Sequence, residues 1–280
     1  MVHLSPEQVV TGYGRAAAAV RAAVVAFAAA AWRAQGSYRD ADVDALVALI
    51  VPRVRAGQVQ VANLTSAYIA QVATLRTGVL VSPVGVDVAA VTGGRGVPAE
   101  DVYRRPAVEV YTALAGGASY PDAVSRGLGR LVSLVSTDVQ MAKVRQSRAS
   151  MGASGARFYR RVLNGGDNCA MCMLASTQRY RVKDLSPIHP GCDCSVDPLP
   201  PGEDEFQVLD PDEVERIHAA VGERLGVEDR GGRAVDYRKL VIVREHGEYG
   251  PTLTLKGHRF TGPEAARSGI DLSVAGLARA

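Results

Sequence analysis

All four cysteines of this 280-residue chain lie in one short stretch, and they limit what that stretch can fold into. It contains Cys169-Ala-Met-Cys172 and, after a spacer, His189-Pro-Gly-Cys192-Asp-Cys194. Thiolates and a neutral imidazole are the ligands that Zn²⁺ prefers in tetrahedral structural sites, and a Cys-x₂-Cys turn places two sulfurs at the separation that one ion requires. We therefore predict a metal knuckle with structural Zn²⁺, whose candidate ligands are Cys169, Cys172, His189, Cys192 and Cys194.

Five candidate ligands compete for four positions around one tetrahedral ion. Either Cys192 and Cys194 both bind while His189 stays outside, or His189 replaces one of them. Because a catalytic zinc keeps one position open for water, this surplus of ligands favours a structural role. Disulfides in an oxidising compartment are one alternative, and catalytic or redox thiols are another. The start of the chain, Met1–Glu7, has no basic segment running into an apolar core, so no export signal is predicted.

The residues before the cysteines are rich in Ala, Val and Leu, and their apolar positions repeat mainly at helical spacing. With 47% hydrophobic residues, the chain is long enough for one large or two modest domains. The predicted fold class is mainly α, with an extended helical N-terminal region, a small Cys/His zinc-knuckle module and a small α+β C-terminal tail. The predicted boundaries are a helical arm over 1–97, a basic helical region over 98–165, the Cys/His metal knuckle over 166–200, and an acidic linker plus α+β tail over 201–280.

Proline, glycine and capping residues divide the helical region. Pro52 is expected to kink or end its helix, and the glycine-rich stretch 77–97 is expected to be a long connection, either a hinge or a segment that lies against a partner. The predicted helices run from Ser5-Pro6-Glu7 to Trp32, from Asp42 to Ile50, from Gln58 to Arg76, from Pro98 onward, and from Pro121-Asp122 to Val162.

Charge is distributed unevenly along the chain. Residues 101–161 hold ten Lys or Arg against four Asp or Glu, a net charge of +6, while residues 195–280 hold eleven against sixteen. A basic block can attract a phosphate backbone through counterion release, and the alternative is an ordinary solvated helix face. The candidate nucleic-acid contacts are the basic residues in the later part of the last helix: Lys143, Arg145, Arg148, Arg157, Arg160 and Arg161.

The C-terminal part shows three signals. The proline-rich and acidic stretch 198–205 is typical of a linker, and Asp210-Pro211 is expected to begin a short helix that reaches Leu225. The β-rich runs 240–243 and 252–255 predict a small hairpin.

The motifs of several other protein classes are missing. The longest uncharged apolar stretch, Ala22–Trp32, is too short to cross a bilayer, so no membrane span is predicted. A serine protease needs a nucleophile and a base, but no Gly-x-Ser-x-Gly turn accompanies the five histidines, and no His-Glu-x-x-His motif is present. Gly93-Gly94-Arg95-Gly96 lacks the Lys-Ser/Thr of a phosphate-binding loop. We predict no catalytic residue and no enzyme.

The stretch from Arg161 to Pro198 resembles the phage Mu F-like family of head morphogenesis proteins, in the form found in tailed phages of actinobacteria. In that family a long helical region leads into Cys-x₂-Cys, a variable loop and a His-Pro-x-Cys-x-Cys ending, and these elements stand here in that order. The helical arm is like the family's helical region only in being helical, and no family pattern continues beyond Pro200. The spacer from Met173 to Ile188 departs from the pattern because it is short and basic, with no extra element expected.

The resemblance implies a minor capsid protein that is present in a few copies inside the head near the portal. Its implied role is head assembly, together with DNA packaging or ejection. The implied partners are the portal protein, the major capsid protein and packaged double-stranded DNA, and an oligomer is compatible with this role. The implied location is the capsid interior of the virion after assembly in the host cytoplasm. The resemblance implies no settled catalysis, and a capsid maturation protease or a DNA-acting effector enzyme is the alternative function.

Overall fold

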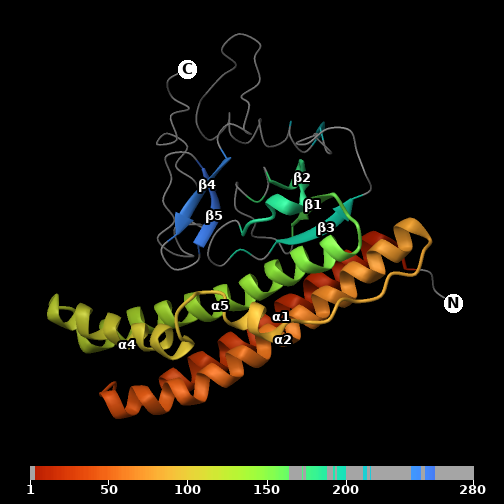
Figure 1. Cartoon of the computed structure of the whole chain (residues 1–280). Helices are drawn as coiled ribbons and strands as arrows, with labels where there is room; N and C mark the ends of the chain where they lie inside the picture. Colours follow the sequence, from red (N-terminus) through yellow and green to blue (C-terminus); the bar gives the residue numbers. More distant parts are fainter. Residues whose placement is uncertain are drawn as a thin grey trace, which may run out of the picture. The chain divides into compact units, whose positions relative to one another are not determined.

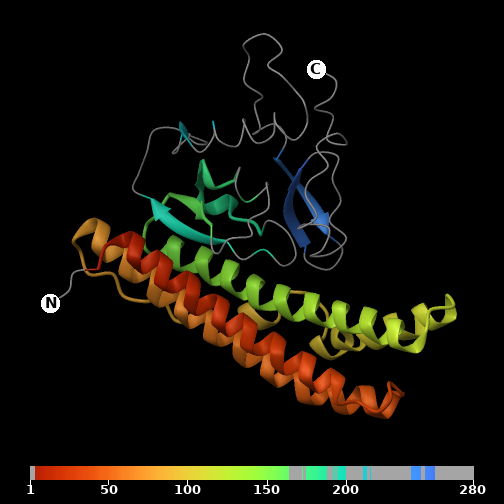
Figure 2. The same ribbon diagram turned by 180° about the vertical axis from the view of Figure 1, so that it is seen from behind.

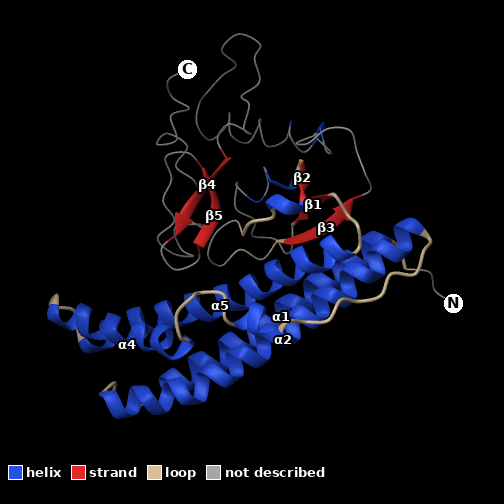
Figure 3. Cartoon of the chain, viewed as in Figure 1, coloured by secondary structure: helices blue, strands red, loops and turns tan. Residues whose placement is uncertain are grey.

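The structure is a computed structural model (Figure 1). It describes residues 4–163, 172, 175–187, 192, 194–199, 211, 212, 215, 241–246 and 250–255, the last two ranges as backbone. This part of the chain is mainly helical, with one three-stranded antiparallel sheet and one two-stranded hairpin (Figure 3).

Helices make up most of the first half of the chain. They are α1 (Pro6–Arg33), α2 (Asp40–Thr77), α3 (Val88–Thr92), α4 (Ala99–Ala115) and α5 (Tyr120–Ala153). The remaining elements are β1 (Phe158–Val162), β2 (Arg179–Arg181), the 3₁₀ turn η1 (Val182–Asp184), β3 (Ser195–Leu199), β4 (Val241–His246) and β5 (Gly250–Leu255).

The chain forms two compact units, and α1, α2 and α5 contribute residues to both. The helical unit consists of Arg15–Ala67 and Gly85–Ser147. The sheet unit consists of Met1–Gly14, Tyr68–Val84 and Arg148–Ala280.

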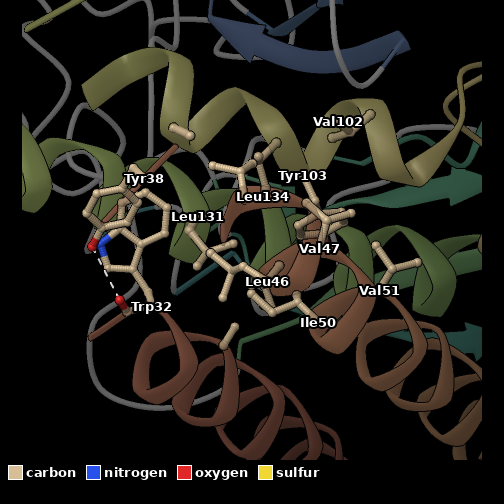
Figure 4. Packing of buried hydrophobic residues seen from close by; sticks show 14 of the residues in the cluster. Trp32, Tyr38, Leu46, Val47, Ile50, Val51, Val102, Tyr103, Leu131 and Leu134 are labelled. Atoms are coloured by element: carbon tan, nitrogen blue, oxygen red, sulfur yellow. Dashed lines mark hydrogen bonds between the residues drawn. The ribbon is translucent and has the colours of Figure 1, made fainter. Parts of the chain in front are cut away.

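Apolar side chains from four helices and the α1–α2 connection fill the core of the helical unit (Figure 4). Trp32 is almost fully buried; its ring lies 4.4 Å from that of Tyr38, and its indole nitrogen donates to the carbonyl of Val124 at 3.3 Å. Each buried side chain of this size contributes on the order of 1.5–3 kcal/mol through removal of apolar surface from water. The core also contains Leu46, Val47, Ile50, Val51, Val102, Leu131 and Leu134.

Two glycines allow the helices of this unit to approach closely. A Cβ atom on Gly57 of α2 would lie 2.5 Å from a methyl carbon of Val24 on α1. A Cβ on Gly127 of α5 would lie 2.6 Å from the Trp32 ring and 2.8 Å from the carbonyl oxygen of Pro106 on α4. Figure 2 shows α1 and α2 side by side, as this close packing requires.

The predicted helix starts at Ser5, Pro98 and Pro121 are confirmed. At Ser5, the hydroxyl oxygen accepts from the Gln8 amide at 3.3 Å while the Gln8 side chain accepts from the Ser5 amide at 2.8 Å. This reciprocal pair is a capping box, which satisfies two amides that the first helical turn leaves without partners.

Pro52 does not end a helix, so the two runs predicted over 42–50 and 58–76 are one helix, α2. A proline inside a helix removes one backbone hydrogen bond. Here Ile50, Val51 and Val54 around it are buried in the helical core. Tertiary packing on both sides of the proline therefore outweighs the local cost.

The last long helix ends at Ala153, so the prediction of helix as far as Val162 is wrong. Gly155 adopts a left-handed conformation with φ +74°, which glycine tolerates best. The amide of Ala156 donates to the carbonyl of Met151 at 3.2 Å, and the amide of Gly155 donates to the carbonyl of Gly152 at 3.4 Å. These two bonds form a Schellman motif, which closes the helix and turns the chain into β1.

The connection predicted over 77–97 contains the short helix α3. The Asp87 side chain caps that helix by accepting from the Ala90 amide at 3.0 Å. Within the helical unit, Arg95 pairs with Asp138 of α5 through its Nε at 2.7 Å, and Asp138 also accepts from the hydroxyl of Tyr103 at 2.8 Å. The second half of the connection is thus tied into the helical core, and a hinge there stays a prediction.

The predicted C-terminal hairpin is present, with β4 and β5 antiparallel from the pair Val241–Leu255 to the pair His246–Gly250. The predicted acidic linker lies outside the described residues, as does most of the helix predicted over 210–225.

Two helices meet the length and hydropathy criteria for a membrane span. The most apolar windows of α1 and α2 have mean hydropathies of 1.4 and 1.2, and 33% and 50% of those windows are buried inside the structure. Core helices of soluble proteins meet the same criteria, so the expectation of no membrane span stays a prediction.

Candidate metal centre

The three-stranded sheet places the side chains of the candidate site. Its order is β2-β1-β3, both pairings are antiparallel, and β1 is the central strand. Successive side chains of a strand point to opposite faces of a sheet. Arg160 and Arg161 therefore project from opposite faces of β1.

The face that carries Arg160 is organised by a buried carboxylate. Asp197 of β3 is 0% exposed; one of its oxygens accepts from Arg76 at 2.7 Å and from Arg160 at 3.0 Å. Burial raises the pKa of Asp197, and the two arginines oppose that effect. Arg76 belongs to α2, where Tyr68 also donates to the carbonyl of Val196 in β3 at 2.8 Å. This face thus attaches the sheet to the last turns of α2.

The cysteines gather beside the residues of the other face. The sulfurs of Cys172 and Cys192 lie 3.5 Å apart, and those of Cys192 and Cys194 lie 3.0 Å apart. All three sulfurs lie within 4.8 Å of one another, and all three side chains are buried. The fold therefore brings together sulfurs that are 20 positions apart along the chain.

Arg161 contacts this sulfur cluster. One guanidinium nitrogen donates to the sulfur of Cys194 at 3.5 Å, and the other terminal nitrogen donates to the carbonyl of Ser186. The aromatic ring of Tyr159, also from β1, lies 5.9 Å from the guanidinium carbon, and Tyr180 of β2 stacks on Tyr159 at 5.5 Å. Arg161 itself is only 2% exposed.

The buried sulfurs need positive charge beside them to exist as thiolates. Burial alone would lower the pKa of Arg161, but attraction to Tyr159, Cys194 and Cys192 outweighs it and raises that pKa. The pKa of the bare Cys192 thiol lies well above its ordinary value, because the hydrogen bond with Cys172 lowers it less than Cys194 and burial raise it. Three thiolates in so small a buried space repel each other unless more positive charge is present. A divalent metal ion would supply that charge.

The sulfur geometry fits a metal ion better than a disulfide. A disulfide needs a separation of about 2.05 Å between its sulfurs, whereas the shortest separation in this cluster is 3.0 Å. Metal–sulfur bonds of about 2.3 Å in a tetrahedron put two sulfurs about 3.8 Å apart. The observed separations of 3.0 Å and 3.5 Å are shorter than that value but nearer to it than to a disulfide, and the third pair of sulfurs also lies within 4.8 Å. Cys172, Cys192 and Cys194 can therefore bind one metal ion.

Three of the five predicted ligands thus come together, while Cys169 and His189 lie outside the described residues. The histidine side chains on which an enzyme reading depends also lie outside the described part of the chain. The basic spacer after Met173 contains β2 and η1, although no element was predicted there.

Two of the six predicted nucleic-acid contacts are buried. Lys143 is 5% exposed and Arg161 is 2% exposed, so neither lies on a surface where a phosphate backbone could reach it. For Arg161 the physical reason is its place on a sheet face beside the cysteines, which the prediction of a helix through Val162 did not anticipate. The prediction of DNA contact conflicts with the burial of these two residues.

The other four basic residues do not form one helical face. Arg145 lies in the helical unit and donates to the carbonyl of Gly94 at 2.9 Å, while Arg160 pairs with Asp197 in the sheet unit. Arg148 and Arg157 are exposed. A nucleic-acid contact through these two residues stays a prediction.

Sequence reasoning missed two residues that shape the site, Arg161 as a neighbour of the sulfurs and Asp197 as a buried anchor. The sequence does contain a signal for the strand that carries Arg161. Two aromatic residues and a β-branched one, which are common in strands, stand in Phe158-Tyr159-Arg160-Arg161-Val162. The pairing of that strand with β3 is not a local signal.

Comparison of the chain with protein-family models, with curated proteins and with solved structures finds no match.

Proposed function

We propose that the chain is a phage minor capsid protein of the Mu F-like head morphogenesis type, and that its knuckle is a structural zinc centre. The observation that carries this proposal is the gathering of the Cys172, Cys192 and Cys194 sulfurs within 4.8 Å in a buried site. The order of the cysteine and histidine motifs along the chain supports the family, and the sulfur cluster supports a metal at its centre.

Zinc is the ion that such a donor set favours, because thiolates are among its preferred ligands in tetrahedral structural sites. Cys172, Cys192 and Cys194 would hold it, with Cys169 or His189 as the remaining ligand. The ion would link the start of β3 to the segment that precedes β2. Metal binding of this kind contributes directly to folding, since the unfolded chain has no assembled site.

The zinc centre is tested by elemental mass spectrometry of the purified full chain and of Cys192→Ser. We expect about one zinc per wild-type chain and a loss of stoichiometric zinc in the variant. Leu185→Val is the matched control, since Leu185 is buried in the same unit and offers no ligand atom. Wild-type protein without bound metal would overturn the zinc centre.

The role in the head is tested on virions assembled from the genome that encodes the chain. Quantitative mass spectrometry of purified heads is expected to find a few copies per particle, and crosslinking is expected to join them to the portal or the major capsid protein. Heads that contain no copy of the chain would overturn the capsid role while leaving the zinc centre standing.

Contact with packaged DNA would rest on exposed basic residues such as Arg148 and Arg157. Binding of this electrostatic kind weakens steeply with added salt, because it depends on counterion release. Duplex binding that does not weaken with salt, or no binding at low salt, would exclude it. Arg148→Ala/Arg157→Ala is the corresponding variant, with Arg33→Ala/Arg53→Ala as the control, since it removes the same charge from exposed arginines outside the basic region.

A further inference from the structure

Among the described residues, the buried Arg161 side chain hydrogen-bonds a sulfur and a carbonyl rather than a carboxylate. Most buried cations lie beside a carboxylate, because an unpaired charge is costly inside a protein. Arg161 donates hydrogen bonds to the sulfur of Cys194 and to the carbonyl of Ser186. The neighbouring Arg160 has the ordinary arrangement, with Asp197 as its partner at 3.0 Å.

We propose that Arg161 is a positioning residue of the metal centre, which orients the Cys194 thiolate by a hydrogen bond to its sulfur and balances part of the charge of the sulfur cluster. This inference rests on the proposed metal site.

The planar guanidinium suits this role. It presents several donors in a fixed fork, so one group can hold a sulfur and a carbonyl at once. Ser186 lies between η1 and β3, and Cys194 lies immediately before β3. Arg161 thereby ties the central strand β1 to two points of the segment that delivers Cys192 and Cys194.

The surroundings of Arg161 restrict its movement. Tyr159 lies two residues earlier on the same strand face, and Tyr180 stacks against that ring from β2. Tyr159 is fully buried and Tyr180 is half-buried. Charge and hydrogen bonds act more strongly in such a site than at a surface. The groups around a metal's ligands generally orient those ligands and change metal affinity.

Charge balance follows from the same arrangement. Three thiolates carry one more negative charge than a divalent ion neutralises, and Arg161 supplies one positive charge. A neutral fourth ligand would therefore leave the site without net charge.

The test compares Arg161→Met, Arg161→Lys and Arg160→Gln in the full chain, with Zn²⁺ and Co²⁺ as the probes. Competition with a chromophoric chelator measures Zn²⁺ affinity. We expect Arg161→Met to weaken it by about 10- to 100-fold, as loss of a group that supports a metal ligand does. Arg161→Lys keeps the charge but not the fork, so a smaller loss is expected. Arg160→Gln breaks the pair with Asp197 on the opposite sheet face, so it measures how far a loss of sheet stability alone lowers Zn²⁺ affinity, and that loss should be smaller than in Arg161→Met.

The absorption spectra of the Co²⁺-loaded proteins distinguish a hydrogen bond to the metal-bound sulfur from a purely structural role of Arg161, which would leave the spectrum unchanged. Loss of the hydrogen bond to sulfur should shift the sulfur-to-cobalt charge-transfer bands in both Arg161 variants and leave them unchanged in Arg160→Gln. If Arg161→Met does not fold, the spectrum and Zn²⁺ affinity of Arg161→Lys decide the matter. Unchanged affinity and an unchanged spectrum in the folded Arg161 variants would overturn the proposal. Wild-type protein that binds neither ion would instead overturn the metal centre itself.

Discussion

The helical unit and the sheet unit are stabilised by different kinds of buried group. The helical core consists mainly of Val, Ala and Leu side chains with Trp32 among them. The sheet unit buries three charged side chains, Arg161, Arg179 and Asp197, together with three cysteines. Apolar burial is non-directional, whereas a buried charge or thiolate needs a partner at a defined place.

This difference predicts how each unit responds to change. When one methylene group is removed from the helical core, some packing contacts are lost but the helices keep their arrangement. A sheet unit that loses one member of a buried pair leaves the other member without compensation. The sheet unit should therefore depend more on single charged residues and on metal than the apolar core of the helical unit does.

The largest expected effect is that of metal removal from the full chain. Chelation should greatly speed amide hydrogen exchange in β1 and β3, because the binding energy of a structural metal is also folding energy. The core turns of α5 around Leu131 and Leu134 should stay protected, since apolar packing holds them. Hydrogen exchange followed by mass spectrometry measures both regions in one sample.

Equal loss of protection in α5 and in the sheet would contradict the distinction between the two units. No change in either region would show that the sheet does not depend on metal. Adding excess Zn²⁺ back is the control, and it should restore protection in β1 and β3.

The next largest effect is expected from Asp197→Ala. This change leaves Arg76 and Arg160 without the carboxylate that they share, and loss of one member of a buried ion pair costs about 3–5 kcal/mol. The exchange rates of the β3 amides measure the loss of local stability. Asp197→Asn is the matched variant, because it keeps the size of the side chain and removes its charge. Stability within about 0.5 kcal/mol of wild type in both variants would contradict a charge-based role.

In the helical unit, Leu134→Ala should reduce the free energy of unfolding by about 2–5 kcal/mol, because it leaves a cavity in a closely packed core. Leu134 is 0% exposed. Urea unfolding followed by fluorescence measures the change, since Trp32 is the one tryptophan of the chain and lies in the same core. Metal content should stay at the wild-type value. Val108→Ala is the control, because Val108 is 59% exposed.

The same contrast explains how far the sequence could predict the structure. The helix starts at Ser5, Pro98 and Pro121 follow from capping residues and from helical spacing, which are local signals. Pro52 misled the prediction because a local helix breaker was outweighed by packing that involves distant residues. Gly155 was a readable stop signal, but it lay inside a segment whose spacing favoured a helix.

The candidate site was predictable only as a set of ligand types. Cysteine spacing predicted that Cys172, Cys192 and Cys194 share one centre, and the structure brings these three together. The place of Arg161 depends on the pairing of β1 with β3, which sets side chains 33 positions apart in contact. That pairing is not encoded in any one stretch, so the same arginine could be interpreted from sequence as part of a basic surface.

The smallest effect is expected from Arg55→Ala. Comparison of this variant with Arg76→Ala separates the effect of burial from the effect of charge pairing. Arg55 and Arg76 are both arginines of α2 that pair with an acidic side chain, at 3.2 Å to Glu100 and at 2.7 Å to Asp197. The Arg55 pair is 49% exposed on both sides, whereas Asp197 is fully buried. An exposed ion pair contributes about 0–1 kcal/mol, so Arg55→Ala should change the midpoint of urea unfolding very little. Arg76→Ala should cost several times more and should speed exchange in β3. Similar losses in the two variants would show that the pairing of charges, and not the burial of Asp197, determines the dependence of the sheet unit on single residues.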